Sequence, residues 1–114
     1  MIWYRIRLDQ VQSDSPDPIV ITVPLDASSK IALSMPFAGW WGKLKGNAWL
    51  RPVVFQPDGN VRFAQDPEDD RDECISEMQI FGVPIDLGAS FYLKDLEDGD
   101  VSQFIVREKT ELSA

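Results

Sequence analysis

Short segments in which apolar residues alternate with polar ones recur along this chain, and turn-forming residues separate them. In the first segment Ile2, Tyr4, Ile6 and Leu8 occupy every second position, which is typical of a β-strand with one buried face. A β-branched run at 19–23 follows a proline-containing turn and favours a second strand. Short strands with turns at short intervals predict a small barrel or sandwich rather than a βαβ fold.

A turn at residues 57–60 predicts a β-hairpin. It reads Pro-Asp-Gly-Asn, in which proline presets the turn, aspartate bonds to nearby amides and glycine accepts a positive φ. The strands it joins are expected at 49–55 and 61–64. Pro52 cannot donate a ladder hydrogen bond, so it indicates an edge strand or a bulge.

The remaining segments differ in how clearly they predict an element. A glycine turn at 97–100 predicts a second hairpin, between strands at 91–93 and 101–106. Residues 26–34 fit either an N-capped helical turn or the approach to a strand. Residues 69–81 alternate as a strand does, but they also fit a helix with acids at its N-terminus. Both of these assignments stay open.

These patterns together predict one all-β domain over residues 1–114. We expect a small antiparallel β-barrel of about six strands, and the open segments leave room for one short helix. A chain of 114 residues is long enough to bury a core of its own. Neither a charge-rich or Gly/Ser-rich linker nor an internal repeat divides the sequence.

The residue types that the chain lacks exclude several kinds of site. It has no histidine and a single cysteine, Cys74, so it can form neither an internal disulfide nor a zinc site of the usual nitrogen and sulfur ligands. A serine or cysteine nucleophile would lack its usual histidine base. Neither a Walker loop nor a dinucleotide-binding glycine fingerprint is present. We therefore expect a protein that is not an enzyme and that holds no cofactor or metal.

Charge and hydropathy restrict location and partners. The formal net charge of −8 at pH 7 argues against DNA, RNA and anionic membranes as partners. Charged residues interrupt the first apolar stretch, unlike in a signal peptide, and no apolar run approaches the roughly 20 residues that span a bilayer. We expect a cytoplasmic protein that binds another protein, and the oligomeric state stays open.

The acids concentrate at residues 67–73. The carboxylates are those of Glu68, Asp69, Asp70, Asp72 and Glu73. This segment lacks the central glycine and the ligand spacing of an EF-hand loop, so we expect a solvated acidic loop. One alternative is an acidic interface, with which an inhibitor or immunity-type protein masks a basic site on a toxin or nuclease. Another is a small carboxylate-based enzyme, which would need acids that converge in an enclosed pocket.

Residues 36–49 combine aromatic residues, glycines and lysines without any acid, and their glycines predict an irregular loop over 36–46. The candidate binding residues in and after this loop are Trp40, Trp41, Lys43, Lys45 and Arg51. Adjacent tryptophans point to opposite faces of an extended chain, so at most one is expected in the core. Because tryptophan and arginine are enriched at interface hot spots, we expect this aromatic loop to contact a protein or a small ligand. The alternative is that both tryptophans cap the end of the barrel.

The order of features between residues 46 and 106 shows a family resemblance. The features are a glycine, an aromatic residue, Arg51-Pro52, a strand that ends in Phe55, then Val83-Pro84-Ile85, Gly88, Phe91 and a closing strand at 101–106. This order resembles the C-terminal β-barrel of elongation factor Tu and related translation GTPases. The resemblance implies a closed antiparallel barrel of about six strands that binds macromolecules. The family's glycine-rich basic turn is replaced by the acidic residues 94–100, so transfer RNA binding is not implied, and no functional residue of the family is carried over.

Overall fold

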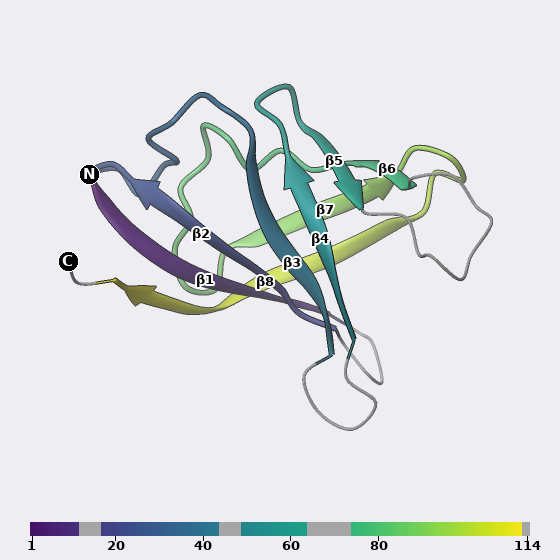
Figure 1. The fold of residues 1–114 in the computed structure, drawn as a ribbon, viewed down its shortest axis with the longest axis horizontal. Helices are drawn as coiled ribbons and strands as arrows, with labels where there is room; N and C mark the ends of the chain where they lie inside the picture. Colours follow the sequence, from purple (N-terminus) through teal and green to yellow (C-terminus); the bar gives the residue numbers. More distant parts are fainter. Residues whose placement is uncertain (12–16, 44–48, 64–73, 113–114) are drawn as a thin grey trace.

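Eight β-strands form the part of the chain that the computed structural model describes, which comprises residues 1–11, 17–43, 49–63 and 74–112. They are β1 (Ile2–Gln10), β2 (Ile19–Leu25), β3 (Phe37–Lys43), β4 (Trp49–Phe55), β5 (Asn60–Phe63), β6 (Cys74–Glu77), β7 (Ser90–Asp95) and β8 (Val101–Glu111). Each strand pairs antiparallel with the next one along the chain, and β1 pairs with β8. The sheet therefore closes into a barrel (Figure 1).

The expected all-β, closed antiparallel architecture is confirmed, and within the described ranges the chain forms no helix. The expected number of about six strands is wrong, because the barrel has eight. Two strands account for the difference. β3 lies in the segment predicted to be irregular, and β6 lies in a segment whose assignment as strand or helix was left open.

β3 corrects the prediction of an irregular loop at residues 36–46. Glycine usually weakens a strand, but here two glycines are needed because neighbouring backbone comes very close. A Cβ atom on Gly39 would overlap the carbonyl oxygen of Val20 on β2, and one on Gly42 would overlap the carbonyl oxygen of Trp49 on β4. These glycines therefore allow β3 to lie tightly between its two neighbours instead of ending it.

Both predicted hairpins are present, because β4 pairs with β5 and β7 pairs with β8. Neither of the open segments is helical where the structure describes it. Residues 26–34 form a turn with an isolated bridge between Leu25 and Ile31, and residues 74–77 form β6.

Pro52 does not occupy the predicted edge or bulge. β4 is paired on both sides, and its register with β3 continues through the pair Trp40↔Pro52. The described ladder between β4 and β5 begins at Val53. Pro52 therefore lies just before that ladder, where its missing N–H interrupts no described pair with β5.

Inward-pointing side chains fill the barrel, as expected for eight strands, whose enclosed space is just wide enough for them. The fully buried ones include Ile6, Leu8, Ile19, Ile21, Val23, Val53, Phe55, Val61 and Val106. Each removes apolar surface from water and stabilises the folded state by about 1.5–3 kcal/mol. This core fixes the strands that carry the candidate site.

The two ends of the barrel are built differently. Where β1 begins and β8 ends, the segment between β6 and β7 inserts Met78, Ile80 and Ile85 into the core, and all three are almost fully buried. We name this the plugged end. The opposite end, where β3 ends and β4 begins, carries the rings of Trp41 and Trp49, and we name it the aromatic end.

Candidate functional site

The candidate binding site lies on the inward-facing side of β3 and β4 at the aromatic end. Trp41 lies directly opposite Arg51. One pair further toward the end, Lys43 lies directly opposite Trp49. Residues opposite each other in a ladder share a face of the sheet, and so do residues two apart on one strand. All four side chains therefore lie on the face of the sheet from which Val53 enters the core. Each ring therefore has a cation as its neighbour both across the ladder and along the strand, and we name these four residues the cation–aromatic array.

The rings of the array pack edge to face. The ring centroids of Trp41 and Trp49 lie 4.7 Å apart at an interplanar angle of 81°. Trp41 meets Phe63 of β5 in the same way, at 5.3 Å and 78°. Such pairs contribute about 0.5–1.5 kcal/mol beyond the area they bury. The contacts therefore hold Trp41 in one orientation between β4 and β5.

Arg51 lies against both indole rings of the array. Its Cζ atom is 5.2 Å from the ring centroid of Trp49 and 5.8 Å from that of Trp41. These distances allow cation–π attraction, because the ring faces are negative and a guanidinium stays charged at any physiological pH. Arg51 also has a further contact within the chain. The two rings thus restrict the position of the guanidinium, a planar group with five N–H donors.

Lys43 completes the array with a more mobile charge. It is exposed at the last position of β3. Within the described ranges its ammonium makes neither a hydrogen bond nor an ion pair. The array therefore combines one cation held against the rings, Arg51, with one solvated cation, Lys43.

Trp40 lies apart from the array. It points to the outer face of the barrel, where the register places it between Val20 of β2 and Pro52 of β4. Val20 also faces outward, yet it is only 7% exposed, as expected if the neighbouring indole covers it. The expectation that the adjacent tryptophans take opposite faces is confirmed, since only Trp41 packs against the core. Both tryptophans are partly buried rather than fully exposed.

The structure thus brings together three predicted residues, Trp41, Lys43 and Arg51, and adds Trp49 and Phe63, which were not among the candidates. The period-two spacing of the predicted strand at 49–55 already placed Trp49 on the face of Arg51. Nothing local in the sequence indicated Phe63, because its contact depends on the pairing of β4 with β5. Several predicted residues lie outside the described ranges: Lys45, Glu68, Asp69, Asp70, Asp72 and Glu73.

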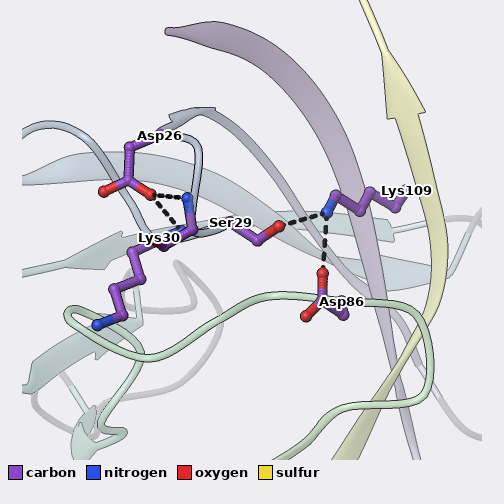
Figure 2. Close-up of polar contacts among 6 residues, drawn as sticks. Asp26, Ser29, Lys30, Asp86 and Lys109 are labelled. Carbon is purple, nitrogen blue, oxygen red and sulfur yellow. Dashed lines mark hydrogen bonds and ion pairs between the residues drawn. The ribbon is translucent and has the colours of Figure 1, made fainter.

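A second inward-facing cation lies at the plugged end (Figure 2). The Nζ atom of Lys109 on β8 lies 3.3 Å from Oδ1 of Asp86 and donates a hydrogen bond of 3.3 Å to Oγ of Ser29. It also lies 5.0 Å from the ring centroid of Tyr4 on β1. The Lys109 side chain is only 16% exposed. This lysine therefore ties β8 to both loops that cover this end.

Ser29 is held in an unusual backbone conformation within this cluster. Its φ is 61°, the left-handed region, which costs a non-glycine residue about 1–2 kcal/mol. The turn itself is closed by Asp26, whose carboxylate accepts hydrogen bonds from the amides of Ser28 and Lys30. The Ser29 carbonyl accepts a hydrogen bond of 2.8 Å from the amide of Ile85. The hydrogen bonds that close the turn, together with the one from Ile85, offset the strain at Ser29.

A serine beside a lysine can form a nucleophile and base pair in some hydrolases. Here the Asp86 carboxylate and the Tyr4 ring both attract the positive ammonium of Lys109. An ammonium has no lone pair with which to take a proton from Ser29. The geometry therefore supports a structural tie at the plugged end, not a nucleophile.

Other kinds of site have less support in the part of the chain that the structure describes. In these residues no three His, Cys, Asp or Glu side chains come close enough together to hold a metal ion, and none of the described elements is a helix able to cross a membrane. An open depression of about 270 Å³ lies on the outer face of β6 and β7, beside Glu77, Tyr92 and Lys94. It is shallow, and its rim offers no fixed cluster of polar groups comparable to the cation–aromatic array.

Comparisons with known proteins identify no relative of this chain. No family model matches the sequence, and neither a curated protein nor a solved structure is significantly similar to it. The resemblance to the elongation factor Tu barrel stays a prediction. The geometry of the site is therefore the basis of the proposed function.

Proposed function

We propose that this chain is a non-catalytic binding module that contacts a protein partner through the cation–aromatic array at the aromatic end of the barrel. Barrel ends are common binding positions, because the closed sheet is rigid and its last inward-facing side chains reach solvent. The array has the residue types that dominate interface energetics, with two tryptophans and an arginine in mutual contact.

One observation carries this proposal: the two adjacent tryptophans have separate roles. Trp41 meets Trp49, Phe63 and Arg51, whereas Trp40 lies on the outer wall of the barrel. Rings held by their neighbours lose little conformational entropy when a partner binds. The array is therefore preorganised, which favours it over the outer face as the contact surface.

The pair of tryptophans also supplies the experiment. The partner is first captured from the native host with the immobilised chain and identified by mass spectrometry. We expect Trp41→Ala to weaken the complex about 30-fold or more, as a hot-spot residue does. Trp40→Ala, the neighbouring residue on the opposite face, should leave affinity within about threefold. Far-ultraviolet circular dichroism at the assay temperature confirms that both variants are folded. Equal loss in the two variants, or no loss in Trp41→Ala, would contradict the proposal.

The acidic-interface alternative is tested on the same captured complex. Replacing Glu68, Asp69, Asp70, Asp72 and Glu73 by their amides removes five negative charges without changing side-chain size. Under our proposal the affinity for the partner stays unchanged or rises. A large drop in the association rate would instead favour an inhibitor that masks a basic site.

A further inference from the structure

We infer that the cation–aromatic array recognises an extended acidic segment of the partner, in which carboxylates occupy alternate positions. The inference rests on the proposed function and names the chemistry of its ligand. Three features lead to it: the charge of the array, the spacing of its cations, and the rings between them.

The charge of the array is opposite to that of the whole chain. The chain carries a net charge of −8, yet the sequence has no acid between Asp26 and Asp58. Both cations of the array, Lys43 and Arg51, belong to this acid-free stretch. At physiological salt, charges more than about 8 Å away are largely screened, so Lys43 and Arg51 act mainly on groups bound close to them. Carboxylates are the groups that such a site favours.

The spacing of the cations matches an extended peptide. Arg51 lies opposite Trp41, and Lys43 is two residues further along β3. The two cations are on neighbouring strands, so they are diagonal neighbours across the ladder, about 7–8 Å apart. An extended peptide places side chains i and i+2 on one face about 6.6–6.8 Å apart, and the long side chains of lysine and arginine can adjust to this small difference. Two carboxylates in an alternating sequence can therefore reach the two cations at the same time.

The rings give the array a second selectivity. Trp41 and Trp49 fill the other two positions, so each carboxylate that reaches a cation passes beside an indole. The rings exclude water from one side of the Arg51 guanidinium, and a charge-assisted hydrogen bond is stronger where water is excluded. Apolar residues between the carboxylates can pack on the same rings. An alternating acidic and apolar segment fits better than a run of consecutive acids.

Synthetic octapeptides with blocked termini test the inference. The first alternates glutamate with valine, the second has the same composition with the four glutamates adjacent, and the third alternates glutamine with valine. Affinity is measured from tryptophan fluorescence. We expect the alternating glutamate peptide to bind about tenfold more tightly than the glutamine peptide, and measurably more tightly than its isomer. Inorganic phosphate at the same anion concentration should not compete, since one anion spans only one cation.

Two substitutions connect the binding to the array. Lys43→Gln removes an exposed charge that makes no described ion pair, so the fold is kept, and binding of the alternating glutamate peptide should fall about fivefold. Lys94→Gln removes an exposed lysine from the outer face of β7 and should leave binding unchanged. Arg51→Lys keeps the charge but loses the planar fork of donors. Its loss of peptide binding should lie between those of Lys43→Gln and Lys94→Gln.

The outcomes separate the inference from the proposed function. Equal binding of the glutamate and glutamine peptides, or equal effects of Lys43→Gln and Lys94→Gln, overturns the acidic-segment inference. The inference is also overturned if none of the three peptides binds while Trp41→Ala still releases the captured partner. In that case the proposed function stands. If Trp41→Ala leaves the captured partner bound, the proposed function fails.

Discussion

Each end of this barrel holds an inward-facing cation against aromatic rings, but the two ends complete that arrangement differently. At the plugged end Lys109 lies over Tyr4, and the adjoining loops add a carboxylate from Asp86 and a hydroxyl from Ser29. At the aromatic end Arg51 lies against two indoles and has a further contact within the chain, and the second cation, Lys43, makes no described ion pair.

Under the proposed function, this difference separates stability from recognition in one closed barrel. The plugged end supplies its own counter-charge and inserts Met78, Ile80 and Ile85 into the core, so its groups are satisfied within the chain. The array places two positive groups and two rings together at the last positions of β3 and β4. Substitutions at the plugged end should therefore change stability, and substitutions in the array should mainly change binding.

The largest stability effect is expected at the plugged end. Ile85 is fully buried, so Ile85→Ala should lower the free energy of unfolding by about 3 kcal/mol, within the range for truncated core aliphatics. Urea unfolding followed by circular dichroism measures the change. Partner affinity, corrected for the folded fraction, should not change. A loss of affinity in the folded variant would show that the plugged end contributes to recognition.

A smaller loss is expected where β3 approaches β4. In Gly42→Ala the new methyl group would overlap the backbone of Trp49, so we expect a loss of about 2 kcal/mol from overpacking. Gly88→Ala is the matched control, since Gly88 also has a positive φ, 84°, but no atom near the added methyl. Its loss should be about 1 kcal/mol, from backbone strain alone. Equal losses in thermal or urea unfolding would contradict the close approach that explains β3.

The smallest effect is expected at Ser29, where two contributions can be separated. Ser29→Ala keeps the left-handed backbone strain but loses the hydrogen bond from Lys109, so it should cost about 1 kcal/mol. Ser29→Gly loses the same hydrogen bond but relieves the strain, so its stability should stay close to that of the unchanged chain. Equal destabilisation of both variants would contradict the backbone strain inferred at Ser29.

Local patterns predicted most of the strands, because their information lies within a few residues. The alternation from Ile2 to Leu8 and the turns at 57–60 and 97–100 correspond to β1 and to the two hairpins. β3 was missed because its glycines are explained only by close contacts with the neighbouring strands. Gly39 and Gly42 look like breaks until the neighbouring strands are in place, and only then do they become the residues that permit close pairing.

The site could be predicted only in part, for the same reason. Composition indicated Trp41, Lys43 and Arg51, because an acid-free aromatic and basic stretch stands out in an acidic chain. Their arrangement as an array depends on the register of β3 with β4, and the contact with Phe63 depends on β5. Neither register is encoded in a short segment, so the sequence alone could not separate Trp41 from Trp40 as a binding residue.

The four tryptophans provide the most direct test, because each has one indole N–H signal and a different position. Trp3 lies at the plugged end, Trp40 on the outer wall, and Trp41 and Trp49 in the array. The ¹⁵N-labelled chain is titrated with the captured partner, and the signals are assigned with single Trp→Phe variants. The account predicts that the indole signals of Trp41 and Trp49 shift while those of Trp3 and Trp40 stay in place. A shift confined to Trp3 or Trp40 would contradict it.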